Sequence, residues 1–355
     1  MAALFNYSFN NINTAALPGA LANTTGSPTV GSGDGPQGIN TFHTDGATAW
    51  GWLPNIGIAI NTVGLILGGG FNVAAASAFA NIFAVGSQGT SNFANALVVQ
   101  VASDGSMQVG VVEGTYYSSP SGTFTFGNRH EIELKISEFS STASVTLYLD
   151  GVSVSGLTSL AFNLSAMPDG ATIHSVAVGG SNAVNNMVDA PTARAIVCDS
   201  FYAFDTSGSF CNAPVGPAIS VPMIPNAPGQ ESAWTPNGAS LGWECISEIP
   251  PDGDTTYISS STPTQEEACA LSAPSGISGV YCVSVISDQR QDTSGGGRTI
   301  ELGLGNGTTR SYGSAWGLGT TYKMNTTAFS ENPFTSSAWT LAAMTGLQVA
   351  ADLAS

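Results

Sequence analysis

Short segments in which polar and apolar residues alternate recur along this chain, and turn-forming residues separate them. Residues 131–136 alternate strictly, and the run 144–149 leads directly into Asp150-Gly151, a dipeptide favoured in tight hairpin turns. Alternation with a period of two is the signature of a strand that buries one face. Many such strands, with no long helical pattern between them, predict an all-β protein built from β-sandwich or jelly-roll domains.

The alternation places the predicted strands. In the first part of the chain they cover 5–9, 96–101, 107–112, 122–126, 131–136, 144–149, 173–178 and 195–203, and the Ala-rich stretch 74–84 is interpreted as part of a strand pair. In the second part they cover 279–286, 298–304 and 321–329. Asn306-Gly307 predicts a hairpin turn. One short helix is expected near the C-terminus, at 341–347, with Thr340 as its N-cap.

A proline-rich segment separates these two sets of strands. Five prolines lie between Pro214 and Pro228, and their spacing favours an extended linker or a strap lying across a surface. A chain of 355 residues is long enough for two domains that each bury a core. We therefore expect a first β-sandwich at 1–210, a linker at 211–232 and a second β-sandwich at 233–355.

The charge of the chain excludes several classes of partner. Seven Lys and Arg stand against 24 Asp and Glu, which gives a net charge of −17. Binding to a phosphate backbone requires clustered cations, so neither nucleic acid nor an anionic membrane is expected as a partner. The most apolar region, 56–85, is interrupted by Gly and Asn, so membrane insertion is not expected. The N-terminus lacks the basic region of a signal peptide, which predicts synthesis in the cytoplasm.

Motifs around the predicted domain boundary resemble those of a known family. Arg194–Asn212 reads RAIVCDSFYAFDTSGSFCN, Ala233–Asn237 reads AWTPN, and Glu248–Ile258 reads EIPPDGDTTYI. In this order they are similar to tailed-bacteriophage virion proteins in which a laminin-G/concanavalin-A-like domain precedes a second β domain. The segments GGGRTIELGL, NPFTSSAWT and LQV follow the pattern of that second domain. Residues 40–205 resemble the first domain, because HEIELKI precedes a strand ending in Asp-Gly.

The resemblance implies a structural role in a virus particle. It implies a capsid decoration protein, a spike or a head or tail fibre, released with the virion by lysis, which forms a homo-oligomer, expected as a trimer, and contacts other capsid or tail proteins. An alternative is a host-glycan-binding module of the virion, and a further alternative is a glycan-cleaving enzyme. The chain departs from the family at Cys198-Asp199-Ser200, where a pair of Asp is usual, so a role that depends on those carboxylates does not carry over.

Glu131 and Glu133 are the residues most suggestive of catalysis. They lie two apart on a predicted strand and therefore project from one face. Retaining glycosidases of the jelly-roll class use carboxylates about 5 Å apart in this way. The position of a third carboxylate is taken by Lys135, however, and Trp residues of a sugar cleft are missing nearby. We expect a solvent-facing polar stripe, no catalytic residues and no enzyme activity.

Trp50, Trp52 and Asp45 are candidates for a glycan-facing site. Aromatic rings can stack on sugar faces, although paired Trp near the start of a sandwich also fit core and rim packing. No calcium loop or other metal-ligand spacing is present in the sequence, so no metal and no cofactor are expected.

The five cysteines show no zinc-ligand spacing. We interpret them as buried thiols that behave as small hydrophobic residues. The alternative is one or two disulfides formed after lysis, and Cys198–Cys211 is the pair favoured by proximity in the sequence.

Overall fold

The structure is a computed structural model that describes, with side chains, residues 64–74, 79–86, 96–111, 114–165, 167, 196–248, 251–293 and 297–354. It also places backbone strands at 3–7, 23–25, 29–31, 41–44, 50–59 and 172–178. These residues form an all-β protein, which confirms the predicted fold class. Helices in the described ranges are short 3₁₀ segments, such as η4 (Leu341–Met344), and none of them is long and apolar enough to cross a membrane.

The chain divides into two compact units. The first extends to Ser220, and the second runs from Val221 to Ser355. The predicted linker 211–232 is therefore divided between the units. Its first part packs on the first unit, where Val215 and Gly216 donate backbone hydrogen bonds to Glu133. Its last part forms β17 (Pro225–Ser232), which pairs with a strand of the second unit.

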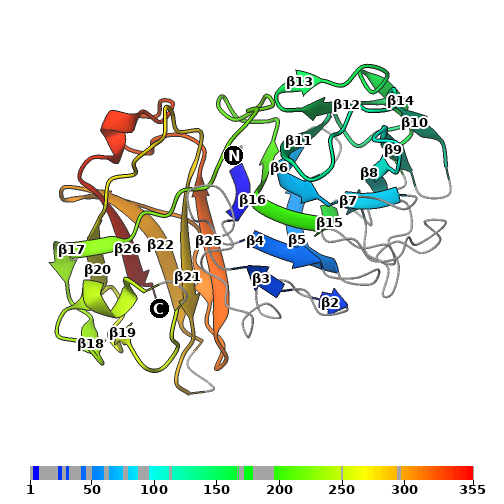
Figure 1. Cartoon of the computed structure of the whole chain (residues 1–355). Coiled ribbons are helices and arrows are strands. Elements are labelled where there is room, and N and C mark those ends of the chain that lie inside the picture. The colour runs from blue at the N-terminus through cyan, green and yellow to red at the C-terminus, as the bar shows by residue number, and fades with distance from the viewer. Residues whose placement is uncertain are drawn as a thin grey trace. The chain divides into compact units, whose positions relative to one another are not determined.

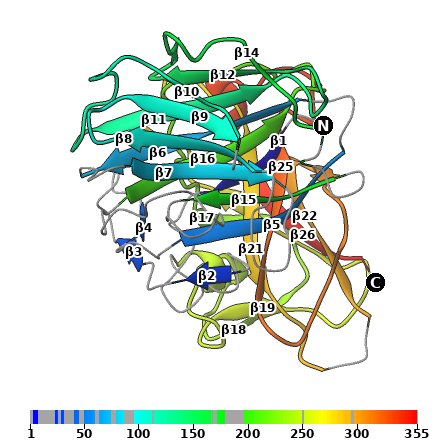
Figure 2. The same cartoon turned by 90° about the vertical axis from the view of Figure 1, so that its right-hand side faces the viewer.

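The first unit is a sandwich of two antiparallel sheets (Figures 1 and 2). One sheet has the order β13 (Val152–Ser153), β12 (Ala143–Leu149), β11 (Arg129–Ile136), β6 (Leu65–Val73), β16 (Ile196–Asp205), β4 (Thr41–Thr44) and β3 (Thr29–Gly31), with β1 (Ala3–Tyr7) on β16 and β14 (Leu160–Phe162) on β12. The other has the order β10 (Tyr116–Ser118), β9 (Met107–Val111), β8 (Leu97–Ala102), β7 (Phe79–Gly86), β15 (Thr172–Val178), β5 (Trp50–Ala59) and β2 (Asn23–Thr25).

Aromatic rings join the two sheets of the first unit. Phe71 on β6 lies 5.8 Å from Phe83 on β7, centroid to centroid, and Phe201 on β16 completes the group at 6.2 Å from Phe71 and 6.3 Å from Phe83. All three side chains are fully buried. Rings at such distances and tilted angles contribute favourable contacts beyond the area that they bury, so this group marks the centre of the core.

A β-bulge in β16 determines which side chains face that core. The register of β16 against β6 shifts between Asp199 and Tyr202, and Ser200 has a φ of 51°. Successive strand residues normally alternate between faces, and a bulge inserts one extra residue into this alternation. As a result Phe201 points into the sandwich, while Asp199 and Tyr202 both lie on the outer face of the sheet.

Most of the predicted strands of the first unit are present, with one clear exception. The Asp150-Gly151 hairpin is confirmed between β12 and β13, since both residues have positive φ, 51° and 81°. The predicted strand 122–126 is wrong, because this stretch consists of turns and bends. There Gly122 N donates to the carbonyl of Asp104, and Phe124 N donates to that of Gly105. The strand that pairs with the second edge of β9, beside β8 on the first, is β10, which lies before this stretch in the sequence.

The second unit is built around a sheet of the order β17, β20 (Glu266–Leu271), β26 (Leu347–Leu353), β22 (Thr299–Asn306) and β23 (Thr309–Tyr312), with β24 (Trp316–Gly317) on β22. Separate two-stranded sheets pair β21 (Val283–Gln289) with β25 (Lys323–Phe329) and β18 (Thr235–Asn237) with β19 (Tyr257–Ser259), beside η3 (Gly242–Ile246). The predicted turn Asn306-Gly307 is confirmed between β22 and β23, where Gly307 has a φ of 58°.

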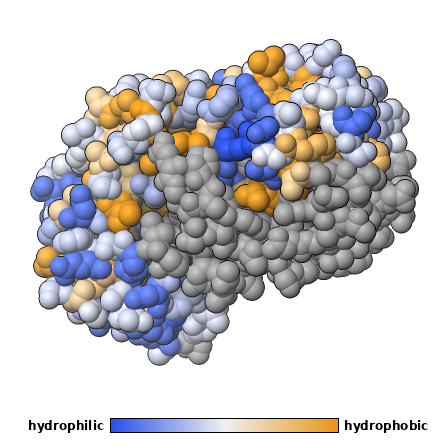
Figure 3. Space-filling model, viewed as in Figure 1, coloured by the Kyte–Doolittle hydropathy of each residue, from blue (hydrophilic) through white to orange (hydrophobic). Residues whose placement is uncertain are grey.

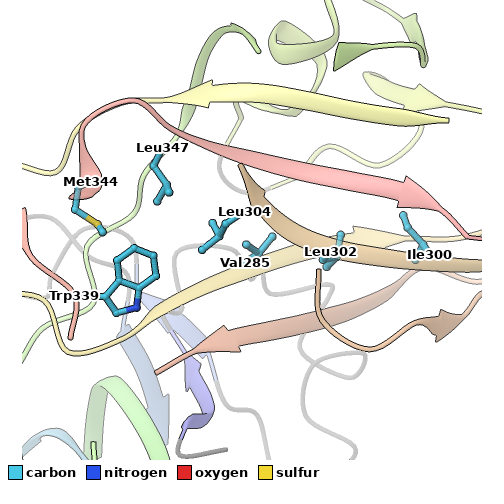
Figure 4. Packing of buried hydrophobic residues seen from close by; sticks show 7 residues of the cluster. All are labelled: Val285, Ile300, Leu302, Leu304, Trp339, Met344 and Leu347. Carbon is cyan, nitrogen blue, oxygen red and sulfur yellow. The ribbon is translucent and has the colours of Figure 1, made fainter. Parts of the chain in front are cut away.

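The core of the second unit lies between the β22–β26 sheet and the β21–β25 pair. Figure 4 shows Leu302 and Leu304 of β22 facing Val285 of β21, with the indole of Trp339 close to Met344. Trp339 Nε1 donates a hydrogen bond to the carbonyl of Phe329, so the buried indole keeps a polar partner. The predicted helix is the 3₁₀ segment η4, and Thr340 caps it as expected, since its hydroxyl accepts from Ala343 N.

The surface reflects the low content of charged residues. Only 9% of the residues are charged, and Figure 3 shows strongly hydrophilic residues as separate groups among intermediate and apolar ones on the visible described surface.

Candidate functional site

Five ionisable side chains gather on the outer face of the first sheet, where β11, β6 and β16 lie next to one another. In the register of these strands, Gly70 of β6 is flanked by Glu131 and Asp199, and Gly68 is flanked by Glu133 and Tyr202. Arg129 enters the same group from the start of β11. We call these five residues, Arg129, Glu131, Glu133, Asp199 and Tyr202, the carboxylate cluster.

The glycines of β6 provide the space that this cluster occupies. A Cβ atom at Gly70 would lie 2.1 Å from Arg129 Nη2 and 2.5 Å from Asp199 Oδ1. A Cβ atom at Gly68 would lie 2.5 Å from the Tyr202 hydroxyl. Because real Cβ atoms do not approach other atoms so closely, side chains other than glycine would displace the cluster. The middle strand thus forms a flat floor on which side chains from its two neighbours meet.

Arg129 and Asp199 form a bidentate ion pair. Arg129 Nε lies 2.8 Å from Asp199 Oδ2 and Nη2 lies 2.6 Å from Oδ1, while Nη2 also reaches Glu131 Oε2 at 3.2 Å. Burial by itself lowers the pKa of the Arg129 guanidinium, but the hydrogen bond and charge of Asp199 hold this pKa above its ordinary value. Two parallel charge-assisted hydrogen bonds fix both side chains in direction.

Glu133 is the most fully hydrogen-bonded acid of the cluster. Its Oε1 accepts from the Tyr202 hydroxyl at 2.8 Å and from Val215 N at 2.6 Å, and its Oε2 accepts from Gly216 N at 2.9 Å. The side chain is completely inaccessible to solvent. Burial raises the pKa of Glu133, and the three donors act against that rise because each of them favours the ionised carboxylate.

Glu131 lies in a different environment, although it is only two residues away. It is also buried, and its Oε1 accepts no hydrogen bond. Burial raises the pKa of Glu131 well above its ordinary value; Arg129 opposes the rise, and the charges of Asp199 and Glu133 add to it. Burial and the same two glutamates raise the pKa of Tyr202, so its phenol stays protonated. The phenol therefore donates a hydrogen bond to Glu133 and keeps its proton.

A later segment of the chain covers the cluster. We call Val215–Ser220 the strap. Besides the two bonds to Glu133, the strap carbonyl of Ala218 accepts from Arg129 Nη2 at 3.2 Å, and Ser220 N donates to Ser200 Oγ at 2.9 Å. Two members of the cluster and the bulge residue thus hold the strap against the sheet.

The predicted solvent-facing stripe on β11 is wrong. Glu131 and Glu133 share a face as expected, but they are only 1% and 0% exposed. Alternation along a strand tells which residues share a face, yet it does not tell what covers that face. Here the cover comes from about 80 residues later in the sequence, as the contacts of Glu133 with Val215 and Gly216 show. The glycine run in β6 and the proline-rich segment are the sequence signals of this contact.

The other predicted site residues do not join the cluster. Trp50 and Trp52 belong to the backbone of β5, with Trp52 opposite Ala177; their side chains, and Asp45 as a whole, lie outside the described residues. Cys198 is buried on β16, Cys211 lies in the loop after it, and the two are not joined in a disulfide. Burial raises the pKa of Cys211 to about 11, which keeps it a thiol.

The cluster is suited to holding backbone in place. Asp199 is paired with Arg129, and Glu133 is saturated by three donors. Among the residues that the structure describes, no group of three or more His, Cys, Asp and Glu side chains is arranged to hold a metal ion. The carboxylate of Glu133 accepts hydrogen bonds from the backbone of the strap, and the guanidinium of Arg129 donates one to it.

Comparison with known proteins gives only distant similarities. No family model matches the chain, and no curated protein matches it. Among solved structures, a Trypanosoma rangeli sialidase bound to 2,3-difluoro-KDN is similar at a TM-score of 0.37 and 11% identity, over 56% of this chain and 30% of the sialidase.

Two further solved structures are similar over most of their own length. An alginate lyase Aly36B mutant in complex with an alginate trisaccharide has a TM-score of 0.39 and 12% identity, over 56% of this chain and 96% of the lyase. Peanut lectin with a nine-residue peptide has a TM-score of 0.37 and 12% identity, over 57% of this chain and 97% of the lectin. Similarities this weak assign no function to the chain.

Proposed function

We propose that this chain is a structural protein of a tailed-bacteriophage particle, where it decorates the capsid or tail as a spike or fibre. The observation that carries the proposal is the order of the motifs that resemble the virion proteins, together with their places in the fold. The strand motif 194–212 contains β16, which pairs with β6 on one side and with β4 and β1 on the other. The motif 233–237 contains β18 and the motif 248–258 contains the first two residues of β19; these strands pair with each other, Asn237 opposite Tyr257.

The remaining motifs occupy framework positions of the second unit. Arg298–Leu304 contains most of β22, which pairs with β26, and the LQV motif opens β26. Trp339 of the NPFTSSAWT motif is 5% exposed and belongs to the core. Trp234 of the AWTPN motif donates from Nε1 to the carbonyl of Gln265. Motifs at such positions specify folding of both units, which supports a resemblance extending over the whole architecture.

In this role the protein acts by attachment and display, as a homo-oligomer that we propose to be a trimer. One unit binds other virion proteins and the other is presented to the surroundings. With a net charge of −17, attachment through nucleic acid is unfavourable. Apolar and backbone contacts depend far less on salt than counterion release does. We therefore expect the protein to remain on particles in molar salt.

The test is mass spectrometry of purified phage particles, combined with gold-labelled antibodies in electron microscopy. Peptides from both units should be found in washed particles, and labels should lie at regular positions on the capsid or tail. After a wash in molar salt the signal should persist, and light scattering of the purified protein should give a small multiple of 36.0 kDa. Absence from particles, or a monomer that binds DNA in a salt-sensitive manner, would contradict the proposal.

A second candidate function, binding of host glycans, rests on exposed aromatic side chains. Tyr257 and Trp316 of the second unit are 38% and 39% exposed, and exposed rings are the groups that stack on sugar faces. A glycan array with the purified protein distinguishes this role. Binding that is lost in Trp316→Ala, with unchanged folding, would support it; an array without any binding would argue for attachment and display alone.

A further inference from the structure

The strap is bound to the first unit by side chains and not by a strand ladder. Its residues lie outside the strands of the described sheets. Its backbone instead meets Glu133 at Val215 and Gly216, Arg129 at Ala218 and Ser200 at Ser220. A segment held in this way depends on a few side chains, whereas a strand shares its hydrogen bonds along its whole length.

Glu133 carries the largest part of this attachment. It accepts two of the four hydrogen bonds that the structure describes for the strap backbone, and each of its oxygens receives one of them. Hydrogen bonds to an ionised group are about twice as strong as those between neutral groups. The Tyr202 hydroxyl holds the carboxylate from the other side, at 2.8 Å from Oε1. Tyr202 thus orients the carboxylate independently of the strap.

The strap leads directly into the second unit. Ser220 is the last residue of the first unit and Val221 begins the second, so no free residue separates them. We propose that Glu133 is the anchor that fixes the connection between the units to the first unit, and that loss of this anchor releases the strap. Thr206 keeps its own hydrogen bonds to Gly64, so release concerns the strap alone. At up to about 3.5 Å per residue, its six residues add up to roughly 20 Å to the connection.

The experiment compares two neighbouring glutamates in the full chain. In Glu133→Gln an amide NH₂ replaces one carboxylate oxygen and confronts a backbone donor of the strap. We expect hydrogen exchange at Val215 and Gly216 to accelerate about tenfold or more, the effect of leaving a buried donor unsatisfied, while β11 stays protected. Limited proteolysis within Val215–Ser220 should also become faster. Glu131→Gln is the matched control, because Glu131 makes no described bond to the strap, and both readings should be unchanged.

A change on the strap itself separates the anchor from the folding of the sheet. Val215→Pro removes one donor to Glu133 and leaves the carboxylate cluster intact. Hydrogen exchange at Gly216 should accelerate in this variant too. If Glu133→Gln does not fold, the exchange rate of Gly216 in Val215→Pro tests the proposal instead. Unchanged protection of the strap in a folded Glu133→Gln or in Val215→Pro would overturn the proposal. Equal loss of protection in Glu131→Gln would also overturn it, because the cluster as a whole and not Glu133 would then hold the strap.

Discussion

Glu131 and Glu133 show how far the role of a residue depends on its partners. They have the same side chain, lie on the same strand and face the same way, and both are buried. Glu133 receives three hydrogen bonds, whereas Glu131 shares one donor, Arg129, with Asp199 and leaves Oε1 without any. An unsatisfied buried acceptor is costly. The two residues should therefore respond in opposite directions to the same substitution.

At neutral pH, Glu131→Gln should stabilise the first unit. The substitution removes a carboxyl group whose ionised form is disfavoured by burial and by the charges of Asp199 and Glu133, and the remaining carbonyl oxygen can still accept from Arg129. We expect the free energy of unfolding to rise by about 1 kcal/mol or more, the order of magnitude that corresponds to a raised pKa of roughly one unit. Denaturant titration followed by tryptophan fluorescence and circular dichroism measures it. A clear loss of stability would show that the ionised form of Glu131 is needed.

The same residue gives the stability a defined pH dependence. The pKa of Glu131 in the folded protein lies well above the ordinary value of 4.5 because of burial. The folded state therefore binds more protons than the unfolded state above about pH 4.5, and stability declines as the pH rises through this window. The stability difference between Glu131→Gln and the unaltered chain should be large at pH 8 and small near pH 4.5. A difference that is constant with pH would contradict the raised pKa.

At the scale of elements, β6 and β16 shape the cluster together. The glycines of β6 leave room above the sheet, and the bulge of β16 brings both Asp199 and Tyr202 into that room. Neither feature takes part in the hydrogen bonds of the cluster. The glycines provide the space that the side chains of the cluster fill, and the bulge determines the face of the sheet on which Asp199 and Tyr202 lie.

Gly70→Ala should destabilise the first unit. The new Cβ would overlap with Arg129 Nη2 and Asp199 Oδ1, so the bidentate pair must move. We expect a loss of about 1–3 kcal/mol of unfolding free energy, as for other overpacked sites. Gly317→Ala is the control, because it also lies in a strand and its Cβ would meet nothing within 4 Å. Equal effects of the two substitutions in thermal or denaturant unfolding would show that the space above β6 is not tightly filled.

The sequence predicted elements better than it predicted the cluster. Alternation located β11 and β12, and the turn residues located Asp150-Gly151 and Asn306-Gly307, because these signals are local. The aromatic stretch 122–126 has the composition of a strand, but its backbone bonds to the turn around Asp104 and Gly105 instead. The burial of Glu131 and Glu133 depends on a segment distant in sequence, and no local pattern contains that information.

At the scale of the whole molecule, the chain consists of two units with separate cores. The aromatic group of Phe71, Phe83 and Phe201 centres the first. The group around Leu304 and Trp339 centres the second. Units with their own cores can in principle fold independently. The proline spacing predicted an extended segment at 211–232, but it did not indicate the partners to which the parts of this segment bind.

Cleavage of the connection should leave both units folded. With a recognition site for a specific protease inserted between Ser220 and Val221, the β signal in circular dichroism should be retained after cutting. Both fragments should also keep cooperative thermal transitions. The strap should remain protected from hydrogen exchange, because all of its described partners lie in the first unit. Loss of the transition of either fragment would show that the cores are not independent.

The bulge at Ser200 changes which residues of β16 face the core. Before it, even-numbered residues such as Cys198 point into the sandwich; after it, odd-numbered ones such as Phe201 do. Removal of this single residue would restore the simple alternation, because Phe201 would then follow Asp199 directly and still face the core, and Tyr202 would still lie opposite Gly68. A deletion at Ser200 should therefore be tolerated better than a deletion elsewhere in β16, which would move every later side chain of the strand to the other face.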